Sequence, residues 1–219
     1  MADRQMLGET VYRQITDLIL RQEIACGDKI AVDALSKQLG VSRTPVTEAV
    51  QRLAREGLVE LFPHRSAEVV TFDKKAKTDL GLTRIMLDTL AVQLAVRYGS
   101  PAEFDELRKI ADECYEVAKA GDVFNWIRLE CEFHLGLATI GKNMNLAGIM
   151  KSLYQKVRLL QFVSYVDNDI SLNMIKLHFD MIDKLEQRDV DGVIRLIHKH
   201  LTYFYDLDEH MISLVRIDF

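Results

Sequence analysis

The stretch Gly40-Val41-Ser42-Arg43-Thr44-Pro45-Val46-Thr47-Glu48-Ala49-Val50 decides how the first third of this chain folds. It predicts a tight turn that leads into a short helix. Ser42 is a residue type that caps helices, and Pro45 fits the first helical turn, where its missing N–H has no acceptor to meet. Apolar residues at helical spacing predict a buried face of Val46, Ala49, Val50 and Leu53. Three polar residues should face outward near the beginning of the helix: Arg43, Thr44 and Thr47.

The residues on either side complete a winged helix-turn-helix. Residues 31–39 predict a short amphipathic helix that ends at Gly40, because glycine readily takes the left-handed conformation. A loose tail and a helix over residues 9–22 precede it. Residues 58–61 and 68–71 have the composition of two short strands, joined by the tip of a wing. In such a fold the N-terminal end of the second helix enters the major groove of DNA. The expected DNA-binding domain spans residues 1–73.

Two runs, residues 41–46 and 52–59, resemble the GntR family of bacterial transcription regulators. The resemblance implies that Arg43 and Thr44 contact duplex DNA and that the wing residues His64 and Arg65 approach a minor groove. Thr47 and Arg52 are expected on or near the same DNA-facing surface, and we add them to the predicted DNA contacts. The family usually has arginine where this chain has Thr47, and glycine where it has Ser66, so its sequence preference is expected to differ from the family norm.

The composition is that of an ordinary soluble protein with room for two domains. The chain has 219 residues, 48% of them hydrophobic and 28% charged, and no apolar run long enough to span a bilayer. It lacks a signal-peptide pattern, and its three cysteines are widely spaced, which favours a cytoplasmic protein with reduced thiols and no membrane partner. Because the net charge is −5, DNA binding must depend on the local placement of cations.

Beyond a charged link at residues 72–76, the chain predicts one helix after another. Turn residues separate helices that end near residues 98, 119, 140, 165, 186 and 213. Ser100 and Glu103 form a capping box with proline between them at the first helical position. Residues 77–219 are therefore expected to be an antiparallel all-helical bundle with short loops, and the whole protein to be mainly α.

Histidines of the bundle predict a metal site. Glu130 and His134 are four residues apart on one helix, so their side chains project from the same face. His178 and His200 lie on the last two long helices, which form a hairpin and can face each other. Three imidazoles and one carboxylate suit a divalent metal ion, with Zn²⁺ favoured and Ni²⁺ or Mn²⁺ as alternatives.

Residues 77–213 resemble the all-helical FCD-type ligand-binding domain of the FadR subfamily of GntR regulators. The resemblance implies a metal held by three histidines and an aspartate four residues before the first of them, where this chain has Glu130. It also implies a small carboxylate effector bound near the metal, for which Arg84 is the expected partner as a bidentate guanidinium. The alternative is that Arg84 only pairs with Asp88, one helical turn further on.

Together these features predict a bacterial repressor that binds a palindromic operator as a homodimer and whose DNA affinity responds to a small organic acid. Two alternatives stay open. One is a metal-dependent enzyme that uses the Glu130 and histidine constellation, but the sequence has no Glu-x-x-His spacing, phosphate-binding loop or nucleophile elbow, and we expect no enzyme. The other is a DNA-binding dimer whose bundle takes no ligand.

Overall fold

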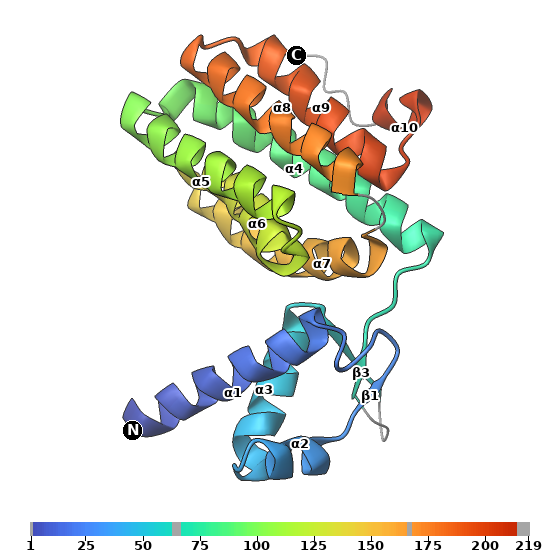
Figure 1. Cartoon of the computed structure of the whole chain (residues 1–219). Helices are drawn as coiled ribbons and strands as arrows, with labels where there is room; N and C mark the ends of the chain where they lie inside the picture. The colour runs from blue at the N-terminus through green and yellow to red at the C-terminus, as the bar shows by residue number, and fades with distance from the viewer. Residues whose placement is uncertain (1, 63–66, 166–167, 214–219) are drawn as a thin grey trace. The chain divides into compact units, whose positions relative to one another are not determined.

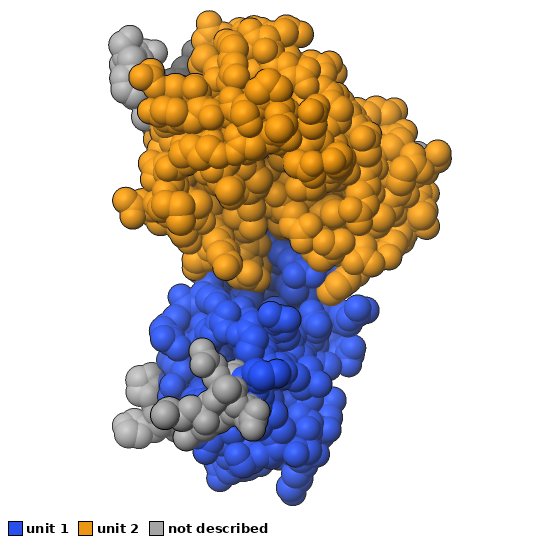
Figure 2. Space-filling model, turned by 90° about the vertical axis from the view of Figure 1, so that its left-hand side faces the viewer, with its two compact units in different colours: residues 1–71, 158–163 blue, residues 72–157, 164–219 orange. Residues whose placement is uncertain are grey.

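The computed structural model describes residues 2–62, 67–165 and 168–213. The chain forms two compact units, one built from residues 1–71 with 158–163 and the other from residues 72–157 with 164–219 (Figures 1 and 2). The described residues are mainly helical, as predicted. Short strands occur in the first unit, and the described part of the second unit contains helices alone.

The first unit is a helix-turn-helix with a small sheet. Its elements are α1 (Ala2–Leu20), β1 (Lys29–Ile30), α2 (Val32–Gln38), α3 (Arg43–Arg55), β2 (Val59–Leu61) and β3 (Ala67–Val69). The strands form an antiparallel sheet in the order β1-β3-β2. Two features differ from the expectation. α1 begins at Ala2, where a loose tail was predicted, and β1, which the sequence did not predict, adds a third strand to the wing.

The apolar face of α3 holds the first unit together. All four predicted core residues are buried: Val46, Ala49, Val50 and Leu53. α3 packs against α1, whose own apolar face includes Val11, Ile15 and Ile19. Gly40 has a φ of +66°, as expected for the residue that ends the preceding helix. Ser42 occupies the N-cap position, but its side chain makes no capping hydrogen bond, so the expected hydroxyl cap is absent from α3.

The second unit is a helical bundle (Figure 1). Its helices are α4 (Lys74–Tyr98), α5 (Pro101–Lys119), α6 (Val123–Ile140), α7 (Met144–Ser164), α8 (Asn168–Glu186), α9 (Val190–Tyr205) and α10 (Glu209–Ser213), except that residues 158–163 of α7 belong to the first unit. α4 begins within the predicted link, because the Asp73 carboxylate caps it by accepting from the Ala76 N–H. The last predicted helix ends early, because Asp206 takes the left-handed conformation with φ of 53° and separates α9 from α10.

The packing of the bundle brings polar residues into its core. α4 packs against α6 and α9, α5 packs against α6 and α8, and α8 packs against α9. Among the described residues of this unit, six arginine, acidic or histidine side chains are buried among the apolar ones: Arg84, Asp88, Glu130, His134, His178 and His200. Because burial of such groups is costly unless they are paired, they must be arranged around one another.

The predicted capping box is present at the beginning of α5. The Ser100 hydroxyl accepts from the Glu103 N–H, and the Glu103 carboxylate accepts from the Ser100 N–H at 2.9 Å. Glu103 also pairs with Lys142, which lies just after α6. The Lys142 contact first, and then the bonds from Ser100, lower the pKa of Glu103 to about 2.

We predict that Glu103→Ala lowers the free energy of unfolding by about 1 kcal/mol at pH 7, because it removes the cap and the ion pair. The pKa of Glu103 in the folded protein lies below its ordinary value of 4.5, so this contribution is present above about pH 4.5 and is lost as pH falls toward 2. Thermal unfolding followed by circular dichroism between pH 7 and pH 3 measures it. Glu106→Gln, at an exposed carboxylate on the same helix, is the control. Equal effects of the two variants at pH 7 would contradict the prediction.

Candidate functional site

Three of the predicted DNA contacts share the exposed N-terminal part of α3. Arg43, Thr44 and Thr47 are all exposed. The Thr47 hydroxyl donates to the Arg43 carbonyl oxygen at 3.0 Å, which keeps it on the outer face of the helix. The Arg43 guanidinium forms an ion pair with Asp33 of α2 at 2.8 Å, and both side chains are largely exposed. Such a pair contributes little to stability and leaves the guanidinium accessible to a ligand.

Arg52 lies in the last turn of the same helix and has a different environment. Its guanidinium contacts Glu9 of α1 at 2.7 Å and Glu56 at 3.1 Å, and lies 3.6 Å from the centre of the Tyr12 ring. The Tyr12 hydroxyl donates in turn to Glu56 at 2.6 Å. This network joins α1 to α3 and gives Arg52 a packing role, while 42% of its side chain is exposed and its expected DNA contact stays a prediction. The two wing residues, His64 and Arg65, lie outside the described residues.

The structure brings together all four predicted metal ligands. Glu130 and His134 of α6, His178 of α8 and His200 of α9 are buried, and their ligand atoms lie within 4.8 Å of one another. Glu130 is at the centre of the group. Its Oε1 lies 2.9 Å from His200 Nε2 and 3.3 Å from His134 Nε2, and its Oε2 lies 3.3 Å from His178 Nε2.

Several atoms of this cluster lack a hydrogen-bond partner among the described residues. They are Oε2 of Glu130 and both ring nitrogens of His178. An unpaired polar atom in a buried site costs free energy. A cation held by the cluster would pair with a carboxylate oxygen and a ring nitrogen, and a donor set of three imidazoles and one carboxylate suits Zn²⁺ and related ions. The residues therefore fit a divalent metal ion.

The protonation states also suit a metal. Burial acts to raise the pKa of Glu130, but the charges of His178 and His200 outweigh it and hold the pKa well below its ordinary value. Burial lowers the pKa of His178 well below its ordinary value, and it lowers that of His200 as well. Metal binding needs an ionised carboxylate and neutral rings, and the lowered pKa values of Glu130, His178 and His200 all lie in that direction.

Arg84 lies beside this cluster and is almost wholly enclosed, with 1% of its surface exposed. Its Nε lies 3.3 Å from Asp88 Oδ2 and donates to the Tyr154 hydroxyl at 3.0 Å. Its Nη1 donates to the Tyr205 hydroxyl at 3.4 Å. Its Nη2 has no hydrogen-bond partner among the described residues and lies 3.8 Å from Glu130 Oε1. Arg84 therefore pairs with Asp88 and also presents one nitrogen toward the cluster.

Asp88 links Arg84 to the histidines, and the sequence did not predict this contact. Its Oδ1 lies 2.9 Å from His134 Nδ1. The Tyr154 hydroxyl donates to the Asp88 carboxylate, with distances of 2.8 and 2.9 Å to its two oxygens. Burial acts to raise the pKa of Asp88, but His134 and Arg84 outweigh it and lower the pKa. The spacing of four residues from Arg84 could have pointed to Asp88, but no sequence signal points to Tyr154 or Tyr205.

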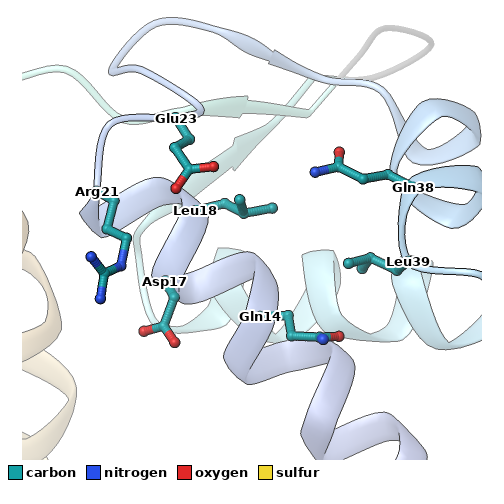
Figure 3. Close-up of a pocket in the computed structure, with 7 residues that line it drawn as sticks. All are labelled: Gln14, Asp17, Leu18, Arg21, Glu23, Gln38 and Leu39. Atoms are coloured by element: carbon teal, nitrogen blue, oxygen red, sulfur yellow. The ribbon is translucent and has the colours of Figure 1, made fainter.

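A separate hollow lies in the first unit, between α1 and α2 (Figure 3). It has a volume of about 240 Å³ and is lined by Gln14, Asp17, Leu18, Arg21, Glu23, Gln38 and Leu39. These side chains are exposed or half-exposed and of mixed charge. The hollow therefore lacks the enclosed, convergent polar groups that mark the cluster in the second unit.

Each of the two units matches a known protein family. The family model of the bacterial regulatory proteins of the gntR family matches residues 7–69, and the family model of the FCD domain matches residues 79–203. The Nta operon transcriptional regulator of Aminobacter aminovorans is 26% identical over 183 residues, which cover 82% of this chain and 84% of that protein. The "Probable D-xylose utilization operon transcriptional repressor" of Paenarthrobacter nicotinovorans is 25% identical, with 94% and 92% covered.

Solved structures share the fold. That of E. coli McbR/YncC has a TM-score of 0.79 at 19% identity and covers 96% of this chain and 99% of its own. A GntR-type regulator from Rhodococcus sp. RHA1 has a TM-score of 0.75 at 21% identity, with 95% and 99% covered. Among the described helices, none is both long and apolar enough to cross a membrane. The chain belongs to the GntR family of bacterial regulatory proteins, carries an FCD domain, and is a transcriptional regulator and not an enzyme.

Proposed function

We propose that this regulator is a cytoplasmic homodimer of the FadR subfamily that represses transcription from a palindromic operator, and that a metal ion and a small carboxylate control its DNA affinity. Residues 1–73 form the DNA-binding domain, and residues 77–219 bind the effector and dimerise. The single observation that carries the ligand proposal is the buried group of Glu130 and three histidines beside the unpaired Nη2 of Arg84.

The DNA contacts that we propose are Arg43, Thr44 and Thr47 at the beginning of α3, with His64 and Arg65 of the wing in the minor groove. The exposed polar face of α3 supports the first three. Arginine can donate two hydrogen bonds to a guanine edge, whereas threonine hydroxyls contact bases or phosphates. Arg52 is a further proposed contact, because 42% of its side chain is exposed in spite of its ion pairs with Glu9 and Glu56.

The proposed metal ligands are Glu130, His134, His178 and His200, with Zn²⁺ as the favoured ion and Ni²⁺ or Mn²⁺ as alternatives. Charge balance supports a cation. With neutral imidazoles, the enclosed cluster has one positive side chain, Arg84, and two negative ones, Asp88 and Glu130. Asp88 and Glu130 raise the pKa of His134 in spite of its burial and of Arg84, so without a metal the site attracts a proton.

A divalent ion would reverse the charge of the cluster and leave it with one excess positive charge. A monoanionic carboxylate would neutralise that excess, with Arg84 Nη2 as the donor closest to the ligand group. Because Nε and Nη1 already donate to protein oxygens, one nitrogen of Arg84 remains for the acid. The expected bidentate clamp therefore becomes a single contact in this proposal.

Ligand binding in the bundle would change helix packing and so shift the freedom of the two DNA-binding domains in the dimer. α4, which contributes Arg84 and Asp88, begins directly after the residues that connect the two domains. A coupling free energy of about 1–3 kcal/mol gives a switch of roughly 5–150-fold in DNA affinity. The sign of the effect depends on which state the acid binds more tightly.

We predict that Arg43→Ala weakens binding to the preferred duplex by roughly 10–100-fold, since a good arginine–base contact contributes about 1–3 kcal/mol of discrimination. The duplex is first selected from a random library with the wild-type protein, and affinity is then measured by fluorescence anisotropy. Arg13→Ala removes the same charge from an exposed site on α1 and is the control. Equal affinities for Arg43→Ala and the wild type would refute the contact.

We predict that Zn²⁺ at 100 times its dissociation constant raises the melting temperature of chelator-stripped protein by about 5–10 °C, because binding to the folded state alone contributes about 2.7 kcal/mol. His178→Phe should abolish the shift, since it keeps an aromatic ring against Phe133 but has no ligand nitrogen. His210→Phe, at an exposed position, is the control. A wild type that retains no metal by elemental analysis and shows no shift would rule out the site.

We predict that at least one small organic acid raises the melting temperature of the zinc-loaded protein and has no effect without zinc. Arg84→Lys should weaken that acid by about tenfold or more, because lysine keeps the charge beside Asp88 but lacks the nitrogen that faces Glu130. Arg97→Lys, at an exposed position of the same helix, is the control. If a panel of mono-, di- and tricarboxylates has no effect, the proposal of a carboxylate effector is wrong. The alternative, a bundle that dimerises and takes no ligand, then holds.

A further inference from the structure

We propose that Asp88 is a positioning residue for the metal site: its carboxylate holds the proton of His134 on Nδ1, so that the lone pair of Nε2 faces the other ligands. The inference rests on the metal site proposed above and adds a residue that is not itself a ligand. It assigns a role to a side chain with no exposed surface, whose contacts otherwise look like a simple ion pair with Arg84.

The first step is the contact between the two side chains. Asp88 on α4 and His134 on α6 are both fully enclosed, and Oδ1 lies 2.9 Å from Nδ1. An ionised carboxylate can only accept hydrogen bonds, so the proton of this contact belongs to Nδ1. In the neutral ring the other nitrogen then carries the lone pair. That nitrogen, Nε2, lies 3.3 Å from Glu130 Oε1 and 3.2 Å from His200 Nε2.

The second step is that Asp88 is itself held in place. Its Oδ1 receives His134 and the Tyr154 hydroxyl, and its Oδ2 receives the same hydroxyl and Arg84 Nε. These donors come from three helices, α4, α6 and α7. Both carboxylate oxygens are therefore occupied, and the carboxylate has no room to rotate without the loss of several bonds. A fixed acceptor of this kind selects one ring orientation and one tautomer.

The third step compares the three histidines. The Nδ1 of His200 lies 3.2 Å from the carbonyl oxygen of Met174, so a backbone acceptor orients that ring in the same way. Neither nitrogen of His178 has a hydrogen-bond partner among the described residues, and its ring is stacked on Phe133 with the centroids 3.9 Å apart. Two of the three ligands thus have an outer acceptor. Without Asp88, His134 would lose its acceptor and its tautomer would no longer be fixed.

The experiment measures zinc affinity and the His134 tautomer in the full chain. We expect Asp88→Asn to lower the affinity for Zn²⁺ by 10–100-fold, measured in competition with a chromophoric chelator. Loss of a carboxylate that hydrogen-bonds to a metal-binding histidine typically has that effect. Long-range ¹⁵N–¹H spectra of the zinc-loaded wild type should show the His134 proton on Nδ1 and none on Nε2, whereas in Asp88→Asn the Nδ1 proton should exchange faster with water because its charged acceptor is lost. Asp79→Asn, at an exposed carboxylate two and a half turns earlier on α4, should change neither property.

A second variant tests the proposal independently if Asp88→Asn folds poorly. Tyr154→Phe keeps the Arg84–Asp88 pair and removes one hydroxyl, so it should weaken zinc by a smaller factor than Asp88→Asn. Zinc binding of wild-type strength in Asp88→Asn, or a proton on Nε2 of His134 in the zinc-loaded wild type, would overturn the positioning role and leave the metal site standing. Failure of the wild type to bind zinc would overturn the metal site itself, and with it this role.

Discussion

A carboxylate enclosed in a helical bundle must be paired, and Glu130 is the group on which the core of the second unit depends. Several kcal/mol are lost when such a charge leaves water, so the fold is stable only if other groups compensate. Here the compensation comes from α4, α8, α9 and from the next turn of α6. Each of these helices must therefore lie at a definite distance and rotation, which fixes the packing of the bundle more tightly than apolar contacts alone.

The same constraint explains why the polar layer extends to Arg84 and Asp88. Arg84 brings the positive charge that an enclosed pair of carboxylates needs, and Asp88 keeps Arg84 paired on its far side. The hydroxyls of Tyr154 and Tyr205 satisfy most of the remaining donors and acceptors. The atoms without a hydrogen-bond partner among the described residues of the cluster are of two kinds. Oε2 of Glu130 and the two ring nitrogens of His178 suit a cation, and Nη2 of Arg84 suits an anion. Oε2 of Glu130 lies 3.3 Å from His178 Nε2, and Nη2 of Arg84 lies 3.8 Å from Glu130 Oε1, but neither contact is a hydrogen bond, which supports the proposal of a bound ligand.

The features that sequence predicted are those that local spacing determines. The apolar stripe of α3, the capping box at Ser100 and the pair of Glu130 and His134 all depend on the period of a helix, and all are present. The features that it did not predict depend on contacts between distant segments. β1 has two residues and is defined by its pairing with β3, and the role of Arg52 depends on Glu9, which lies 43 residues away.

The candidate site shows the same division. Its four ligand residues could be chosen from their positions on predicted helices, because short loops bring neighbouring helices together. The contacts of Tyr154 could not, since its partners Arg84 and Asp88 precede it by 70 and 66 residues and no motif marks the tyrosine. The early end of α9 was also not predicted, because the sequence does not show that Asp206 takes a positive φ.

The first unit shows how a chain of net charge −5 can keep an exposed arginine available for the proposed DNA contact. Arg52 forms ion pairs with Glu9 and Glu56, and the pair with Glu9 links α3 to α1. Arg43 is drawn only toward Asp33, in a pair with 72% and 66% of the two side chains exposed. Solvent screens such a pair, so a phosphate or a guanine can replace Asp33 at a cost of about 0–1 kcal/mol. The difference in exposure between two arginines of one helix thus separates the one that links α1 to α3 from the one whose exposed guanidinium supports the proposed DNA contact.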